Sequence, residues 1–313
     1  NKYLVIKRRK SMTQQNKAKI SYVFALFLYG TMGVVLKYIN LPIEFVVLIR
    51  GIVGSLFLLI LTLITRGKLD TQSIKKNFKY LFLSGMSLGI NWVCLFGAFR
   101  VSTVSISILV DYMAPVFMII VSPLLFKEHL NPKKLICVLI AFIGLIMVSG
   151  VVGSDISMIN VRGLLLAGGA GLGFMGLIIF NKLMGEISVY DKAVVQISIA
   201  ALTVVPFAIK AGLETVIVWD FKSVFLSFMM GLVSTGIAYY FYFYGISGLS
   251  VQTVAVVGYV EPVITVLASV FFLKEPMSML AMIGAVLIIG AAVSSEFMSG
   301  RSADEKELKS SMT

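Results

Sequence analysis

Two carboxylates, Asp111 and Glu261, lie inside long apolar segments of the chain. An ionisable side chain is costly to place in such a segment, so it usually faces a cavity or a partner and is a candidate for function. A carboxyl group there can exchange a proton, bind a cation, or do both. The alternative is structural: a protonated, hydrogen-bonded carboxyl group, or an ion pair. Arg50 and Arg100 are the candidate ion-pair partners of Asp111.

Polar and aromatic side chains accompany these carboxylates in neighbouring apolar segments. Asn91 and Trp92 lie midway along one segment, and Tyr239 and Tyr242 share a helical face of another. Aromatic faces near acids can hold a cationic or aromatic ligand. Tyrosines also gather at membrane interfaces, and a buried Asn can serve a contact between helices. The predicted substrate-binding residues are Asn91, Trp92, Asp111, Tyr112, Tyr239, Tyr242, Tyr259 and Glu261.

A glycine pattern resembling a dinucleotide-binding motif runs through Gly171, Gly173 and Gly176. Such a site needs a strand, a turn and a helix in a soluble domain, whereas these glycines lie inside one apolar segment of helical length. Gly169 and Gly173 have the four-residue spacing that lets membrane helices approach closely. The pattern therefore predicts helix packing.

The residues of common catalytic and cofactor sites are absent from the apolar segments. The single histidine, His129, lies in a predicted loop, and no phosphate-binding Gly-x-x-x-x-Gly-Lys-Ser/Thr sequence occurs. The only cysteines, Cys94 and Cys137, both lie within apolar segments, where they are expected to pack as small apolar side chains. We expect no metal, no cofactor and no enzymatic activity, and transport driven by a gradient.

Long apolar helices must position these side chains. Of the 313 residues, 58% are hydrophobic and 13% are charged, against about 25% charged in soluble proteins. Runs of about 20 apolar residues recur, each long enough to cross a bilayer. We predict an all-α polytopic membrane protein with ten transmembrane helices, near 20–38, 43–65, 78–99, 102–126, 133–152, 162–184, 189–210, 221–245, 251–273 and 277–297.

One stretch of the chain occurs twice, 147 residues apart. This offset aligns Tyr112 with Tyr259, Pro115 with Pro262 and Lys127-Glu128 with Lys274-Glu275. Such an agreement indicates an internal duplication. The predicted organisation is a basic tail (1–19), one repeat of five spans (20–152), a second repeat (161–297) and a second tail (298–313). A proline within a span removes a backbone hydrogen bond, so Pro115 and Pro262 are predicted hinges.

The basic residues are distributed unevenly between alternate loops. With the N-terminus inside, inner segments hold 20 Lys and Arg residues and outer segments hold 6, a bias that places both termini in the cytoplasm. The net charge of +12 is thus accounted for without a nucleic-acid partner. Because five spans make an odd-numbered repeat, the second copy must cross the membrane inverted, an architecture typical of secondary transporters.

These features resemble the drug/metabolite transporter superfamily, in its EamA-like branch. The resemblance rests on ten spans in two repeats and on an apolar span with a central Pro-Val that closes on Lys-Glu. It is best over Thr235–Tyr239 and Tyr259–Glu275, whereas the first repeat has Ala114 where the second has Glu261. It implies a carrier of small metabolites in the cytoplasmic membrane, commonly an exporter.

The resulting hypothesis is a secondary transporter of a small organic metabolite, such as an amino acid, a nucleoside, a nucleobase or a related compound, that works by alternating access. A proton is the candidate coupling ion. A competing hypothesis is an importer of an organic cation bound by aromatic side chains with Asp111 and Glu261. The sequence is also compatible with a membrane-embedded enzyme or lipid-handling protein, and with a non-transporting subunit or receptor.

Overall fold

The computed structural model describes residues 2–102, 104–126, 132–149, 151, 160–274 and 278–294. Within these ranges every regular element is a helix. Seven helical runs are long and apolar enough to cross a membrane, and three further apolar segments are shorter: Ser107–Met118, Leu135–Val148 and Met279–Ser294. The predicted all-α membrane class is therefore confirmed, while the count of ten spans stays a prediction.

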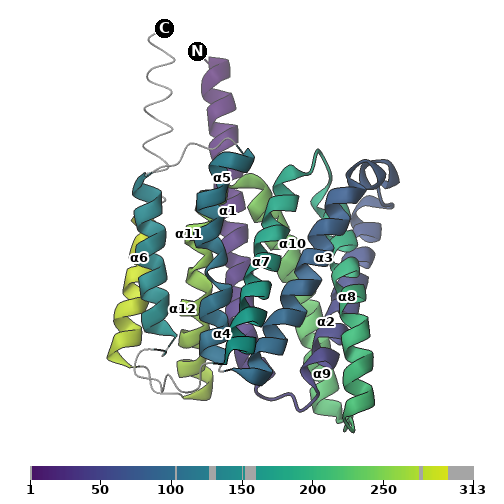
Figure 1. Ribbon diagram of the computed structural model, residues 1–313. Coiled ribbons are helices and arrows are strands. Elements are labelled where there is room, and N and C mark those ends of the chain that lie inside the picture. Colours follow the sequence, from purple (N-terminus) through teal and green to yellow (C-terminus); the bar gives the residue numbers. More distant parts are fainter. Residues whose placement is uncertain are drawn as a thin grey trace.

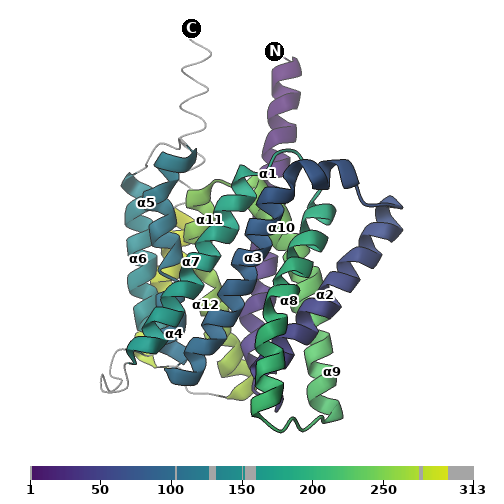
Figure 2. The same cartoon turned by 45° about the vertical axis from the view of Figure 1, so that its right-hand side comes forward.

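The helices stand side by side in one bundle (Figures 1 and 2). In chain order they are α1 (Lys2–Leu36), α2 (Ile43–Arg66), α3 (Thr71–Val101), α4 (Val104–Asp111), α5 (Ala114–Phe126), α6 (Pro132–Val148), α7 (Val161–Leu183), α8 (Val189–Glu214), α9 (Phe221–Met230), η2 (Gly231–Ile237), α10 (Ala238–Gly248), α11 (Val251–Gly258), α12 (Val260–Ala268) and η3 (Ser269–Leu273). A last helix covers Met279–Ser294.

Two helices extend beyond the apolar spans expected for them. α1 continues through the predicted basic tail as one helix from Lys2 (Figure 1). α3 begins at Thr71 because the Asp70 side chain accepts hydrogen bonds from the amides of Gln72 and Ser73, which caps the first turn. The hydroxyl and amide of Ser73 hold the pKa of Asp70 below its usual value.

Small residues bring the helices together. A Cβ built on Gly173 of α7 would lie 2.7 Å from the Ser87 carbonyl oxygen of α3. Gly144 of α6 and Gly284 of the last helix face each other in the same way, each against the other's carbonyl oxygen. The prediction that the glycines of α7 serve helix packing is confirmed.

The packing partners follow a regular scheme. α3 contacts α7 and α8, α1 contacts α10 and α12, and α2 contacts α8 and η2. α4 packs on α7, and α5 on α11. Every one of these contacts joins a helix before residue 152 to a helix after residue 160, so the two halves of the sequence interleave.

Candidate functional site

Two of the spans are broken, each at the same point of the repeat. The first break lies at Tyr112–Met113, between α4 and α5, and the second at Tyr259, between α11 and α12. Pro115 and Pro262 follow within three residues, in the first turn of the second helix, where a missing amide donor costs nothing. Each proline thus begins a new helix after the break instead of bending a continuous one.

Residues that the 147-residue offset makes equivalent touch each other at two places. The Tyr259 hydroxyl donates to the Tyr112 carbonyl oxygen at 2.8 Å, and the two residues are 147 apart. Trp92 Nε1 donates to the Tyr239 hydroxyl oxygen at 3.2 Å, again across 147 residues. A residue that contacts its own equivalent must lie close to the axis that relates the two copies. Four of the predicted site residues therefore mark one line through the centre of the bundle.

Glu261 lies beside this line, in the first turn of α12. Its carboxyl group lines a cavity of about 20 Å³ together with Tyr22, Tyr112 and Gly258. Space of this size accommodates about one water molecule. Glu261 therefore faces the interior between the halves, as its position in the sequence predicts.

Asp111 occupies a separate polar cluster between α3, α4 and α7. Asn91 Nδ2 donates to Asp111 Oδ1 at 3.1 Å and to the Ala170 carbonyl oxygen at 2.9 Å. The two suggested basic partners of Asp111 were wrong, because Arg100 pairs with Glu44 at 2.6 Å and Arg50 makes no ion pair within the described ranges. Asp111 instead faces α7, which approaches closely because Gly171 has no side chain. A Cβ added to Gly171 would lie 3.0 Å from the Asp111 carbonyl oxygen.

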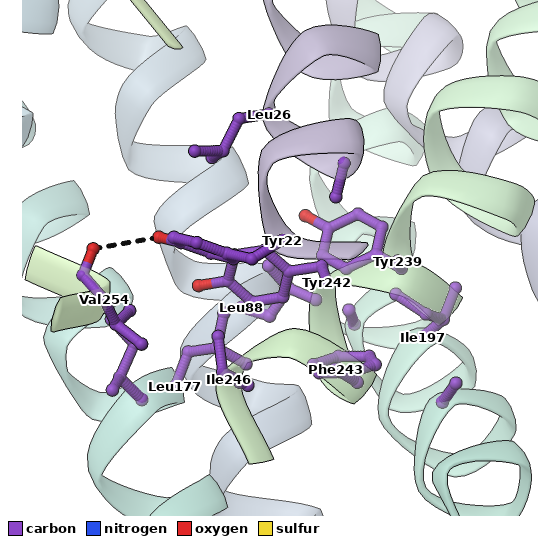
Figure 3. Packing of buried hydrophobic residues seen from close by; sticks show 14 of the residues in the cluster. Tyr22, Leu26, Leu88, Leu177, Ile197, Tyr239, Tyr242, Phe243, Ile246 and Val254 are labelled. Carbon is purple, nitrogen blue, oxygen red and sulfur yellow. Dashed lines mark hydrogen bonds between the residues drawn. The ribbon is translucent and has the colours of Figure 1, made fainter. Parts of the chain in front are cut away.

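Aromatic side chains from α1, α3 and α10 fill the centre of the bundle. Figure 3 shows four of them packed together: Tyr22, Tyr239, Tyr242 and Phe243. The Tyr22 hydroxyl donates a hydrogen bond to the Val254 carbonyl oxygen at 3.1 Å. The ring centroids of Tyr239 and Tyr242 lie 6.0 Å apart, and both side chains are buried. The Tyr242 hydroxyl has no hydrogen-bond partner among the described residues. Tyr239 and Tyr242 therefore lie together, next to Trp92.

Arg50 of α2 joins this cluster although sequence reasoning assigned it no binding role. Its guanidinium carbon lies 4.6 Å from the centroid of the Trp92 ring, and its side chain is buried. Nη1 contacts the Met32 sulfur at 3.0 Å, while Nε has no partner in the described part of the chain. The signal was present in the sequence, since Arg50 lies well inside the predicted span 43–65, whereas the other basic residues of the predicted spans lie within about one turn of a span end.

An open vestibule of about 330 Å³ leads toward this cluster from one end of the bundle. Its lining residues come from α2, α3, α7 and α8: Glu44, Val47, Val93, Phe96, Gly97, Arg100, Val101, Arg162, Leu166, Val204, Phe207, Lys210, Ala211 and Glu214. Phe96, on its wall, has its ring centroid 6.0 Å from the Arg50 guanidinium carbon. A volume above 300 Å³ suits a small organic ligand.

Polar contacts close the opposite end of the bundle. Arg66 at the end of α2 pairs with the fully buried Asp191 of α8 at 2.7 Å. Lys192 Nζ donates to the Ser247 hydroxyl oxygen at 2.6 Å, and Lys182 Nζ to the Leu249 carbonyl oxygen. We call this set of contacts the closed end. α2 and α8 thus meet at the closed end, and at the other end both contribute to the wall of the vestibule.

Apolar helices in two interleaved halves, with charged side chains enclosed between broken spans, define a multi-pass membrane protein of the transporter class. A model of the EamA-like transporter family matches the sequence twice, over residues 17–150 and 161–295. The chain belongs to the EamA-like transporter family, as the resemblance to the drug/metabolite transporter superfamily indicated.

Known proteins agree with this assignment. The chain is 24% identical over 280 residues to the uncharacterized transporter YxxF of Bacillus subtilis (strain 168), with 89% of each chain covered. The fold also resembles that of a protein of known crystal structure, with a TM-score of 0.78 and 20% sequence identity. The similarity covers 90% of this chain and 98% of the other. The second similarity shows a shared fold.

Proposed function

We propose that the protein is a secondary transporter that moves a small organic metabolite across the cytoplasmic membrane by alternating access, in the direction of export. The proposed substrate-binding residues are the eight predicted from sequence, with Arg50 added. Pro115 and Pro262 fix the two helix breaks about which the halves move. Membership of a transporter family supports transport over enzymatic function.

The observation that carries this proposal is the contact between equivalent residues, Trp92 with Tyr239 and Tyr112 with Tyr259. Two inverted repeats of five spans each, 20–152 and 161–297, account for it, because inverted repeats meet on a two-fold axis in the membrane plane. The packing scheme supports the same symmetry. Exchanging the repeats turns the α3–α7 contact into the α10–α1 contact and the α5–α7 contact into the α12–α1 contact.

The vestibule and the closed end correspond to one state of an alternating-access cycle. A substrate enters through the vestibule, while Arg66 and Asp191 hold the other end shut. With ten spans and a 20-to-6 excess of inner basic residues, both termini lie in the cytoplasm and the closed end is cytoplasmic.

Glu261 is the proposed proton-coupling group. Its carboxyl group lies on the small cavity between the repeats, so its protonation can respond to what the cavity holds. Tyr112, at the first break, lines the same cavity. Of the structural alternatives, the ion pair is not formed: Glu261 has none within the described ranges.

The experiment is flux in proteoliposomes under an imposed pH gradient, with Glu261→Gln compared with the wild type. We expect the variant to keep its melting temperature, since Gln preserves shape and hydrogen bonding, and to lose flux driven by the pH gradient. Glu214→Gln, at the vestibule rim, is the matched control. Wild-type flux with unchanged pH dependence in Glu261→Gln would remove Glu261 from the coupling role, and a collapsed melt would make it structural.

A further inference from the structure

Arg50 is a buried cation without an anion. Its side chain is 4% exposed, and the described residues offer it only a methionine sulfur and the faces of Trp92 and Phe96. A guanidinium cannot lose its charge at any accessible pH, so it cannot escape this environment by deprotonation. Nε, which could donate a further hydrogen bond, points at no acceptor among these residues.

The contacts in place do not offset the burial of this charge. A desolvated cation–π contact recovers only part of the free energy that it costs to remove an ion from water, even after relaxation. The remaining cost is lowered when a ligand supplies an anion, because an Arg fork binds a carboxylate through two parallel hydrogen bonds. A membrane-embedded cation held in this way is therefore a candidate binding site for an anionic ligand.

The surroundings favour a negatively charged ligand of small size. The vestibule beside Arg50 carries three basic residues, Arg100, Arg162 and Lys210, against two acidic ones, Glu44 and Glu214. Its volume of about 330 Å³ suits a small metabolite. The guanidinium of Arg50, with one positive charge, matches one carboxylate better than a phosphate, which carries up to two negative charges.

Aromatic rings bound the same site. Trp92 stacks on the guanidinium, and its indole donates to Tyr239. The Tyr29 ring lies 5.2 Å from that of Tyr239 and 5.9 Å from that of Tyr242, measured between ring centroids. These rings offer a flat apolar surface to the body of a ligand whose anionic end is at Arg50.

We propose that Arg50 binds the carboxylate of the transported substrate, which makes the cargo a small carboxylate-bearing metabolite with an apolar or aromatic body. This inference rests on the proposed transport function. It also disfavours an organic cation as the cargo, because the aromatic face that would hold such a cation is already occupied by the guanidinium of Arg50.

The test is a flux screen in proteoliposomes containing the full chain. The compounds form matched sets: the twenty amino acids and 3-phenylpropionate as carboxylates, 3-phenylpropionamide and nucleosides as neutral compounds, and phenethylamine and choline as cations. We expect saturable flux of carboxylates only. Flux of neutral or cationic compounds alone would overturn the Arg50 proposal and leave transport standing, and no flux of any compound would refute both.

Two variants separate binding from a structural role. Arg50→Gln is expected to raise the KM of the transported carboxylate about 10- to 100-fold, the loss expected for a charged hydrogen-bonding group. Its melting temperature in detergent should equal or exceed that of the wild type, because an unpaired buried charge is removed. Arg50→Lys keeps the charge but loses the fork, so its KM should lie between the two. An unchanged KM, or a melt that falls in both variants, would contradict the proposal.

Discussion

Breaking the ion pair between Arg66 and Asp191 is expected to open the closed end. This pair is the described ion pair that connects the two repeats, since it joins α2 to α8. The Arg66 side chain is 37% exposed and that of Asp191 is 0% exposed. Removing one partner of a fully buried pair costs about 3–5 kcal/mol, and an exposed pair contributes about 0–1 kcal/mol. For this half-buried pair we take about 1–3 kcal/mol, between these two limits.

That free energy corresponds to a shift of roughly 5- to 150-fold in the balance between the two states. Thr62 lies one turn before Arg66 and is fully buried. A cysteine introduced at this position, in a protein lacking Cys94 and Cys137, becomes accessible only when the closed end opens, so its reactivity measures the shift. The rate at which an impermeant thiol reagent modifies the Thr62→Cys site should rise by that factor in Arg66→Gln.

The matched control is Glu214→Gln. Glu214 pairs with Lys210 at 3.7 Å, but both side chains are exposed and belong to one helix, α8, so breaking this pair frees no movement between the repeats. The modification rate at position 62 should stay at the parental value. Equal rates in the Arg66 variant and its parent, or equal increases in both variants, would refute the idea that the Arg66–Asp191 pair holds this end closed.

Three further outcomes are expected. Gly173→Leu should lower the melting temperature sharply, because its side chain would enter the α3 backbone, whereas Gly168→Ala should not, since nothing lies within 4 Å of that position. Tyr259→Phe should cost about 1 kcal/mol in unfolding free energy by removing the bond between the two helix breaks; an unchanged melt would show that this bond contributes little. Cysteine at Glu214 should react with an impermeant reagent added outside intact cells and cysteine at Lys75 should not, and the reverse pattern would overturn the orientation.

The architecture could be predicted from the sequence because the signals that encode it are local or periodic. Apolar runs of helical length predicted the helical bundle, and the 147-residue offset predicted equivalent positions in two spans. The breaks at Tyr112 and Tyr259 fall where that offset aligns them. The depth of Glu261 could be read from the length of its span, and the structure places it on the cavity between the halves.

The pairing of charged side chains could not be predicted in the same way. Which neighbour a side chain meets depends on the rotation of each helix about its axis and on how closely its partner approaches. From the sequence, Arg50 and Arg100 were the candidate ion-pair partners of Asp111. The glycine face of α7 instead lets α3 and α4 pack so that Asn91 contacts that carboxylate. Arg50 then faces Trp92, a contact between α2 and α3 that no spacing in the sequence encodes.

The two acidic residues near the starts of α2 and α8 are equivalent under the same offset, yet they are used differently. Asp191 pairs across the repeats with Arg66, while Glu44 pairs with Arg100 inside its own repeat. Alternating access in an inverted-repeat protein amounts to an exchange of conformations between the repeats. In the opposite state Glu44 should therefore take over the role of Asp191 and form an ion pair across the repeats with α8, which closes the vestibule.

Lys210 of α8 is the basic residue placed to receive Glu44, since both line the vestibule. Lys210 now pairs with Glu214 at 3.7 Å. Because both side chains are exposed, this ion pair contributes little free energy and does not prevent Lys210 from pairing with Glu44. A protein lacking the native cysteines, with Glu44→Cys and Lys210→Cys, should be cross-linked by a short bifunctional thiol reagent, more in the Arg66→Gln background than without it. The cross-linked protein should show no flux until a cleavable linker is cut. Equal yields in both backgrounds, or full flux in the cross-linked protein, would show that the vestibule does not close by this exchange.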